Sequence, residues 1–370
     1  MDELEKLRKQ IDETDEKLLG AFVKRLEIAE GVARYKIDRN KPVFDAAREE
    51  EVLKKREQMA GDPALAKDVR RLFILLMSIS RARQQALINR QSEKSRRQAH
   101  SVAGAIAFCG IPGAYAHQAL TDVFGMDANA MALGSFEEVF SAVADGRAAC
   151  GVLPIENSHA GSVLRVYDLL DEYPLYITGE YLLKIEHALL AKRGTALSDI
   201  RKVYSHEQAL SQCAEYLAAH KGWELVPYYN TAAAAKFVAQ SEDKSAAAIA
   251  SRYAGELYGL NVLEDGINTS SENATRFILL SKEMQEKPVA KKASIRFSLE
   301  HKAGSLQRAL AHFAEYGLNM VKIESRPMPG RSFEYIFYVD FEGKDVSEAV
   351  RGALEDAGGV LREPRILGVY

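Results

Sequence analysis

Charged side chains occupy positions in the N-terminal segment where a helix would otherwise be apolar. A buried helical stripe is predicted by apolar residues that recur at multiples of seven positions: Leu4, Ile11, Leu18 and Val32. Arg25 takes the missing position of this stripe, and Lys36 follows eleven residues later, about 20° away around the helix. Because a buried cation is costly unless it is paired, these two residues indicate either structural ion pairs or a binding site for an anion.

Arg8 cannot share a small ligand with Arg25 of the same chain. It lies seventeen residues earlier, which corresponds to roughly 25 Å along a helix. If Arg8 is functional, it must therefore serve a second site, most simply one in a partner chain. A long helix with an apolar stripe also cannot bury itself within so small a segment, which favours an intertwined dimer.

Polar side chains also interrupt the apolar faces of two further predicted helices. The three helices are expected over residues 2–38, 44–60 and 65–91. One face of the second helix carries Asp45, Arg48, Glu49 and Val52. An apolar stripe of the third helix is extended by Ser80 and Gln84. Independent helix–helix hydrogen bonds could explain any one of these positions, but they fit the whole set poorly.

Three stretches of this segment, LRKQIDETDEKLL, KPVFDAAREEEVL and RQQAL, resemble the all-helical chorismate mutase domain over nearly all of residues 1–90. The resemblance implies a dimeric bundle that binds chorismate between its helices. A Claisen rearrangement of this kind needs a compact substrate conformer and hydrogen-bond donors aimed at the developing charge. It needs no nucleophile and no metal.

The same resemblance assigns roles to the polar residues. It implies that Arg25 and the partner subunit's Arg8 bind the two carboxylates of chorismate. Lys36 and Gln84 would be catalytic, donating hydrogen bonds to the ether oxygen as it gains negative charge. Glu49 would hold the ring hydroxyl. The remaining residues that line the implied site are Asp45, Arg48 and Ser80.

Short apolar runs alternate with helical ones over residues 105–283, which predicts an α/β domain with one or two lobes. Polar residues follow two of its predicted strands, at the carboxyl ends where α/β ligand clefts form. The first group contains Asn157, within VLPIENSHAGSV, and the second contains Ser205, within VYSHEQALSQC. Ser205 could instead cap a helix, with Gln208 completing a capping box. Gln212, seven residues after Ser205, would share its face.

Thr275 and Arg276 open a predicted buried strand, in the stretch SSENATRFILLSK. They could be no more than its polar end. Strand alternation predicts that if Thr275 faces a cleft, Phe277 lies on the same side and Arg276 points away. We therefore expect Arg276 to pair within the fold or with a neighbouring element rather than to bind substrate.

Four motifs in order, GIPGAYAHQAL, PIENSHAGS, YSHEQALSQC and NATRFILL, resemble prephenate dehydratase over about residues 104–283. The resemblance implies two periplasmic-binding-protein-like α/β lobes with prephenate between them. The implied prephenate-binding residues are Asn157, Ser205, Gln212 and Thr275. Thr275 would be the catalytic hydroxyl, able to help the ring hydroxyl leave as water while carbon dioxide is lost. One departure is Ala116, where a serine commonly follows the aromatic residue.

Residues 293–370 predict the order strand, helix, strand, strand, helix, strand of an α+β ferredoxin-like module. The stretch EHKAGSLQRALAHFAEYGLNMVKIESRP resembles an ACT regulatory domain of the phenylalanine-binding kind. The resemblance implies phenylalanine as effector, bound between paired modules. The implied effector residues are Gly304, Ser305, Leu306, Glu324, Ser325, Arg326 and Pro327. Ser305 replaces an alanine that is usual in this motif.

Length and composition set the remaining expectations. The predicted segments are a mutase domain (1–91), a linker (92–104), a dehydratase domain (105–283), a second linker (284–292) and the ACT domain (293–370). A net charge of -3 implies no nucleic-acid partner, and three widely spaced cysteines fit neither a disulfide framework nor a zinc site. No signal peptide and no membrane span is predicted, so a cytoplasmic protein without cofactor or metal is expected.

These patterns together predict a bifunctional enzyme of phenylalanine biosynthesis, forming a homodimer or a higher homo-oligomer. It would rearrange chorismate to prephenate and convert prephenate to phenylpyruvate, with feedback inhibition by phenylalanine. Two alternatives stay open: a dehydratase that prefers arogenate, and a non-catalytic ligand sensor. The fused mutase segment argues against the first alternative, and the polar set on its helices argues against the second.

Overall fold

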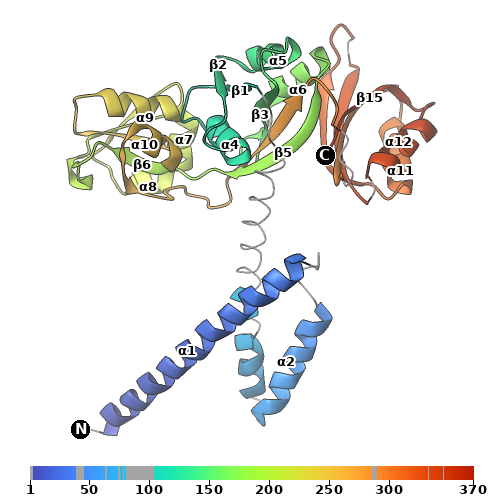
Figure 1. Ribbon diagram of the computed structural model, residues 1–370. Coiled ribbons are helices and arrows are strands. Elements are labelled where there is room, and N and C mark those ends of the chain that lie inside the picture. Colours follow the sequence, from blue (N-terminus) through green and yellow to red (C-terminus); the bar gives the residue numbers. More distant parts are fainter. Residues whose placement is uncertain are drawn as a thin grey trace. The chain divides into compact units, whose positions relative to one another are not determined.

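The computed structural model describes residues 3–38, 46–62, 65–73, 76–77, 79–80, 104–285, 290–331, 333–344 and 346–370. Side chains of residues 33–34, 36–38 and 46–50 are outside this description. The chain divides into two compact units, Met1–Ala99 and His100–Tyr370 (Figure 1). Among the described residues, no helix is long and apolar enough to cross a membrane.

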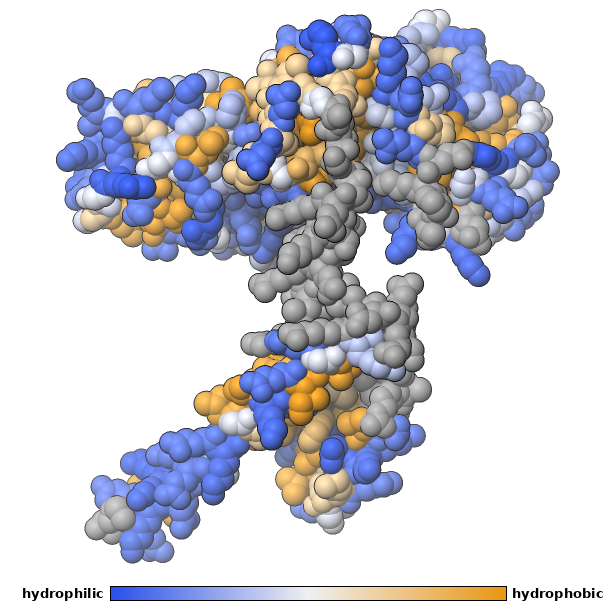
Figure 2. Space-filling view, in the orientation of Figure 1, coloured by the Kyte–Doolittle hydropathy of each residue, from blue (hydrophilic) through white to orange (hydrophobic). Residues whose placement is uncertain are grey.

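The first unit is helical, as predicted. It contains α1 (Glu3–Asp38) and α2 (Ala46–Ala60), and the described residues from 65 to 80 are helical as well. Among the described residues of this unit, the buried apolar side chains of α1 lie in its second half, where Leu26 and Ala29 are buried together with Leu53 and Met77. In Figure 2 apolar residues gather over this part of the unit, while the first half of α1 presents a hydrophilic side.

The apolar stripe on the first half of α1 is uncovered within a single chain. Its leucine and isoleucine side chains are between 50% and 59% exposed: Leu4, Leu7, Ile11 and Leu18. Contiguous apolar surface of this kind is usually covered by a partner. The predicted stripe is therefore present, but its partner does not come from the described residues of the same chain.

The second unit begins with two α/β lobes. In lobe 1 the strand order is β2-β1-β3-β11-β5, with β4 paired to β3. Its strands are β1 (Ile106–Cys109), β2 (Ala130–Leu133), β3 (Cys150–Asn157), β4 (Gly161–Ser162), β5 (Tyr176–Lys184) and β11 (Ala274–Ser281). Its helices are α4 (Tyr115–Phe124), α5 (Phe136–Ala144) and α6 (Leu164–Glu172). Buried apolar side chains on both faces of the sheet form its core.

Lobe 2 has the strand order β10-β6-β9-β7-β8. Its strands are β6 (Ala188–Ala191), β7 (Lys202–Ser205), β8 (Glu224–Pro227), β9 (Ala246–Ala250) and β10 (Asn261–Glu264). Its helices are α7 (Glu207–Gln212), α8 (Ala214–Ala218), α9 (Thr231–Gln240) and α10 (Arg252–Tyr258). The chain crosses between the lobes twice, at residues 185–187 and 265–273. The predicted α/β domain is thus observed with two lobes (Figure 1).

The C-terminal module has the predicted βαββαβ order. Its elements are β12 (Lys292–Leu299), α11 (Ser305–Glu315), β13 (Asn319–Pro327), β14 (Tyr335–Glu342), α12 (Val346–Asp356) and β15 (Leu361–Val369). The sheet order is β13-β14-β12-β15, and the two helices cover one face of the sheet. The third strand begins at Tyr335, two residues later than expected, and Phe333 just before it has a positive φ of 62°, which is not a strand conformation.

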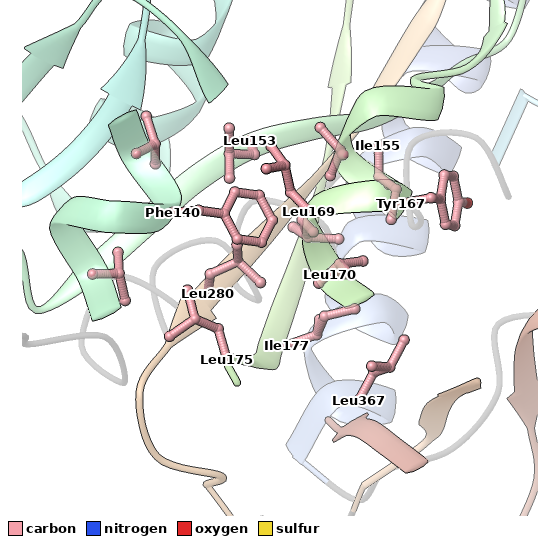
Figure 3. Packing of buried hydrophobic residues seen from close by; sticks show 14 of the residues in the cluster. Phe140, Leu153, Ile155, Tyr167, Leu169, Leu170, Leu175, Ile177, Leu280 and Leu367 are labelled. Atoms are coloured by element: carbon pink, nitrogen blue, oxygen red, sulfur yellow. The ribbon is translucent and has the colours of Figure 1, made fainter. Parts of the chain in front are cut away.

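The other face of this sheet packs directly on lobe 1. Ile336, Tyr338 and Leu367 of the module belong to the same buried cluster as Leu153 and Ile177 of lobe 1. Figure 3 shows Leu367 beside Ile177 in this shared core. The backbones approach so closely that a Cβ on Gly368 would lie 2.0 Å from the carbonyl oxygen of Ile177. Lobe 1 and the module therefore form a continuous hydrophobic core.

Arg276 lies at this junction and is almost completely buried, with 11% of its side chain exposed. Its guanidinium pairs with Asp340 of β14 at 2.7 Å, Glu180 of β5 at 3.2 Å and Glu156 of β3 at 3.4 Å. Burial acts to lower the pKa of Arg276, but the facing carboxylates, Asp340 first, outweigh it and raise that pKa. The prediction that Arg276 pairs within the fold or with a neighbouring element is confirmed.

We expect Arg276→Ala to lower the free energy of unfolding by about 3–5 kcal/mol, because Asp340 would keep a buried charge without its cation. Urea unfolding of the full chain measures the change. The matched control is Arg252→Ala, which removes an exposed ion pair with Asp265 and should leave the unfolding midpoint nearly unchanged. A clean loss of prephenate binding by the Arg276 variant, without loss of stability, would contradict this structural role.

Candidate active sites

Asn157 and Thr275 meet at the ends of two paired strands of lobe 1. They are direct cross-strand neighbours in the β3–β11 pair. The Asn157 amide nitrogen donates to Thr275 Oγ1 at 3.0 Å and to Asn273 Oδ1 at 2.9 Å. The amide oxygen of Asn157 accepts from the backbone N–H groups of His159 at 3.0 Å and Ala160 at 2.8 Å. These backbone donors fix the orientation of the amide, so its nitrogen must face Thr275.

The Thr275 hydroxyl keeps its own proton available. Oγ1 accepts from Asn157, and no acceptor for the hydroxyl hydrogen is found among the residues that the structure describes. The side chain is 9% exposed, so this proton is held close to the protein interior. A hydroxyl that accepts one hydrogen bond while its own hydrogen is free can donate to an incoming oxygen. Lobe 1 thus presents a fixed, uncommitted donor.

Ser205 lies at the end of β7 and is completely buried. Its hydroxyl donates to the carbonyl oxygen of Ile249, on the neighbouring strand β9, at 2.6 Å. The alternative that Ser205 caps the following helix is wrong. The helix begins one residue later than that alternative requires, and the N-cap is His206, whose Nδ1 accepts from the Gln208 N–H at 3.2 Å. In this structure the Ser205 hydroxyl proton is therefore committed to the sheet.

Gln212 ends α7 and is bound to both crossings between the lobes. Its carbonyl oxygen accepts from the backbone N–H of Thr269 at 2.8 Å, in the second crossing. Its side-chain Oε1 lies 2.9 Å from Nε2 of His187, in the first crossing. His187 was missed by the sequence reasoning. The available signal was a single histidine within the apolar run LLKIEHALLA.

The two lobes also touch through the turn before α4. The Tyr258 hydroxyl donates to the carbonyl oxygen of Pro112 at 2.5 Å, and the Tyr253 hydroxyl lies 3.0 Å from Nδ1 of His117. Gly113 has a φ of 90°, and a Cβ there would lie 3.1 Å from the Tyr258 ring. Glycine is needed at this turn for both reasons. No hydrogen bond joins the Asn157–Thr275 pair to Ser205 or Gln212 within the described part of the chain.

In the helical unit the structure brings Arg25 and Ser80 together. Arg25 donates to Ser80 Oγ at 2.6 Å and to the carbonyl oxygen of Leu76 at 2.9 Å. Burial lowers the pKa of Arg25, which is the sign expected for a partly desolvated cation. Arg8 is exposed on the first half of α1. The other predicted chorismate contacts have side chains outside the described residues: Lys36, Asp45, Arg48, Glu49 and Gln84.

A pocket of about 370 Å³ lies in the C-terminal module, between the start of α11 and β14. Among its lining residues are Leu299, Glu300, Ser305, Leu306, Tyr335 and Phe337. Gly304, with a φ of 78°, forms the N-cap at its edge. The predicted Glu324 and Arg326 lie instead on the face of β13 toward lobe 1. Ser325 and Pro327 are exposed on the same strand.

Glu324 and Arg326 connect the module to lobe 1. Glu324 accepts from the Ser162 hydroxyl at 2.5 Å, and Arg326 forms a two-pronged ion pair with Asp168 at 2.7 and 2.9 Å. The Ser162 hydroxyl also accepts from the Lys322 ammonium at 2.9 Å. Ser162 follows the Asn157 strand by only a few residues. The contact face of β13 is therefore tied to the segment that carries Asn157.

Comparisons with known proteins match both parts of the chain. Two family models fit it: Chorismate mutase type II over residues 7–85 and Prephenate dehydratase over residues 106–285. The bifunctional chorismate mutase/prephenate dehydratase of Escherichia coli K12 is 34% identical over 370 residues, covering 98% of this chain and 95% of that protein. The chain belongs to this bifunctional family. It is accordingly an enzyme with two activities, an isomerase and a lyase, as predicted.

Two further relatives each cover 72% of this chain. Arogenate dehydratase 2 of Petunia hybrida is 38% identical over 283 residues, covering 72% of this chain and 71% of that protein. The crystal structure of a prephenate dehydratase in complex with L-Phe from Arthrobacter aurescens is 32% identical, with a TM-score of 0.66. It covers 72% of this chain and 89% of that chain. Within the described residues, no group of three or more histidine, cysteine, aspartate or glutamate side chains could hold a metal ion.

Proposed function

We propose that Thr275 is the proton donor of the dehydratase reaction and that Asn157 prepares it for this role. In the reaction the bond between the ring and its carboxylate breaks, the carboxylate leaves as carbon dioxide, and the electron pair of the bond enters the ring. The carbon–oxygen bond to the ring hydroxyl then breaks, and that oxygen leaves as water with the proton from Thr275. The observation that carries the proposal is the hydrogen bond from the Asn157 amide to Thr275 Oγ1, at 3.0 Å. Solvent restores the proton afterwards.

Asn157 acts here by holding its side-chain amide in a fixed orientation toward Thr275. Its amide oxygen is held by two backbone N–H groups, so the atom that faces Thr275 is the amide nitrogen, which can donate but not accept. Donation into Oγ1 polarises the hydroxyl and makes its hydrogen a better donor. A neutral donor suits a reaction that is driven by the formation of an aromatic ring, because only partial acid assistance is required. Gln212 would contact prephenate from lobe 2 and remains a prediction. So does Ser205, whose buried hydroxyl donates to the Ile249 carbonyl oxygen in this structure.

For the mutase reaction we place chorismate against Arg25 and Ser80, with the partner subunit's Arg8 completing the site. The hydrogen bond between Arg25 and Ser80 supports a shared site on adjacent helices. The uncovered stripe on the first half of α1 supports a dimer in which a second helix covers it. Lys36 and Gln84 would then supply the hydrogen bonds to the ether oxygen.

The pocket of the C-terminal module is the proposed phenylalanine site. The L-Phe complex of the Arthrobacter aurescens relative supports this ligand, since that structure covers 72% of this chain with a TM-score of 0.66. Ser305 and Leu306 line the pocket, and Gly304 borders it, as the ACT resemblance implies. An amino acid bound there would reach the dehydratase through β14 and β13, whose opposite faces meet lobe 1. A cytoplasmic location stays a prediction.

The direct experiment supplies chorismate to the purified chain and follows prephenate and phenylpyruvate over time. We expect phenylpyruvate to form, and its formation to fall when phenylalanine is added. Prephenate that accumulates without phenylpyruvate would rule out the dehydratase step. Unchanged rates with phenylalanine would rule out the regulatory site alone, because both reactions would still proceed.

The similarity to Petunia arogenate dehydratase 2 favours one second candidate, in which the dehydratase domain accepts arogenate and yields phenylalanine directly. The two substrates differ only in an amine in place of a carbonyl group on the side chain. The values of kcat/KM on prephenate and on arogenate, measured on the same preparation, decide between them. The fused mutase domain makes prephenate the expected better substrate.

A further inference from the structure

His187 is enclosed between the two lobes at the first crossing, with only 2% of its surface exposed. Its Nδ1 lies 2.8 Å from the hydroxyl of Tyr115, the first residue of α4 in lobe 1. Its Nε2 lies 2.9 Å from Oε1 of Gln212, the last residue of α7 in lobe 2. The backbone is held as well, since the N–H of His187 donates to Asn268 Oδ1 at 2.6 Å. The imidazole is thus fixed against both lobes.

Tyr115, His187 and Gln212 form a series of hydrogen bonds, and the orientation of the Gln212 amide decides which atoms in it donate. Gln212 presents its carbonyl oxygen to Nε2, so Nε2 must carry a hydrogen. A neutral imidazole carries only one, which leaves Nδ1 as an acceptor. The single hydrogen of the Tyr115 hydroxyl is then shared between Nδ1, at 2.8 Å, and the Glu186 carbonyl oxygen, to which the hydroxyl donates at 2.9 Å. Burial lowers the pKa of His187 and raises the pKa of Tyr115, which keeps the imidazole neutral and the phenol protonated.

The side-chain nitrogen of Gln212, at the end of this series of hydrogen bonds, is an unused donor. With Oε1 turned to His187, the Gln212 amide nitrogen points its two hydrogens away from the imidazole. Among the residues that the structure describes, none accepts from this nitrogen. Gln212 is also only partly buried, so the donor can meet a ligand. Its natural partner is an anionic or carbonyl oxygen, since these groups only accept hydrogen bonds.

We propose that His187 is a positioning residue of the dehydratase site, which sets Gln212 so that its amide N–H groups donate to an oxygen of the substrate. The inference rests on the proposed role of Gln212 in binding prephenate. Tyr115, whose hydroxyl also donates to the Glu186 carbonyl oxygen, holds the other side of the ring. The chain Tyr115–His187–Gln212 thereby links a motif of lobe 1 to a motif of lobe 2 through a residue that neither motif contains.

Two substitutions of His187 separate this role from simple packing. The amide of a glutamine side chain can reach the position of Nε2, whereas that of asparagine reaches only Nδ1. His187→Asn is expected to raise KM for prephenate on the order of tenfold, with a smaller change in kcat, because Gln212 loses its fixed orientation. His187→Gln should stay within about threefold of the unmodified chain, since it restores a donor to Oε1.

The test uses the full chain, with thermal unfolding and mutase activity measured on every variant. Adding Gln212→Ala to His187→Asn should cause little further loss, because the two residues act as one unit. Gln212→Glu should bind prephenate at least about tenfold more weakly, since a carboxylate accepts from Nε2 but offers no N–H to the substrate. This variant keeps the test decisive if His187→Asn fails to fold.

Equal losses in the asparagine and glutamine variants, in step with a lower melting temperature, would overturn the positioning role. So would additive losses in the double variant, or unchanged binding by Gln212→Glu. If the unmodified chain turns over no prephenate, the proposed function fails instead. The inference is then decided by equilibrium binding of prephenate, for which His187→Asn should show on the order of a tenfold higher Kd than the unmodified chain and His187→Gln should not.

Discussion

Thr275→Ala is expected to abolish phenylpyruvate formation while leaving the conversion of chorismate to prephenate unchanged. The substitution removes the uncommitted hydroxyl proton at the end of β11, and loss of a general acid costs about 10²–10⁴-fold in rate. The fold should tolerate it, because the Asn157 amide nitrogen keeps Asn273 Oδ1 and the Ala274 carbonyl oxygen as acceptors. Phenylpyruvate formation from supplied prephenate and prephenate formation from chorismate are the two measurements.

Two further variants show whether the hydroxyl itself is responsible. Thr275→Ser retains the hydroxyl and should keep the dehydratase rate within about tenfold, the size of one ordinary hydrogen-bond effect. Ser281→Ala removes a buried hydroxyl from the opposite end of the same strand, where it donates to the Glu283 carbonyl oxygen. This control should leave both activities intact. Dehydration by Thr275→Ala at a rate near that of the unmodified chain would remove Thr275 from the reaction.

The sequence alone predicts those features of the site that follow from the local geometry of a single strand or helix. Alternation along a strand placed Thr275 and Arg276 on opposite sides, and the structure confirms the predicted pairing of Arg276. Local geometry could not identify the partners of Arg276, since Glu156, Glu180 and Asp340 come from three different strands. Which carboxylates converge is decided by strand order and by the packing of the C-terminal module on lobe 1.

His187 was missed for the same reason. Its two side-chain partners, Tyr115 and Gln212, are 72 and 25 residues away along the chain. A histidine in an apolar run has no period or spacing that reveals such partners. Ser205 illustrates the reverse case, because its local pattern left a helix cap open as an alternative, while the hydroxyl is used by the neighbouring strand.

For the ESRP motif (residues 324–327), the sequence reveals the alternation of the side chains but not their packing partners. Alternation separates Glu324 and Arg326 from Ser325 and Pro327, but it does not say which pair meets the dehydratase lobe. In the structure Glu324 and Arg326 bind Ser162 and Asp168, so the contact face is the charged one. Any effect of this motif on the pocket must therefore pass through the strand rather than through these two side chains directly.

Arg25→Ala is expected to abolish the mutase activity and to spare the dehydration of supplied prephenate. The partly buried guanidinium would bind a carboxylate of chorismate, and removing such a group costs about 10²–10³-fold in rate. Ser80 keeps its hydrogen bond to the Leu76 carbonyl oxygen, so the helix should remain. Arg71→Ala, which removes an exposed cation near Asp68, is the matched control. Loss of both activities in a folded Arg25 variant would show that the two units are not functionally separable.

A mixture of Arg8→Ala and Arg25→Ala chains tests whether the mutase site is shared between subunits. In a mixed dimer, one site combines an intact Arg25 with the partner subunit's intact Arg8, while the other site lacks both. Free exchange at equal amounts makes half of the dimers mixed, so about a quarter of the mutase activity should return. Each variant alone should stay inactive, because every site then lacks one arginine. If exchange is demonstrated and no activity returns, Arg8 does not complete the partner's site, and the uncovered stripe of α1 has another occupant.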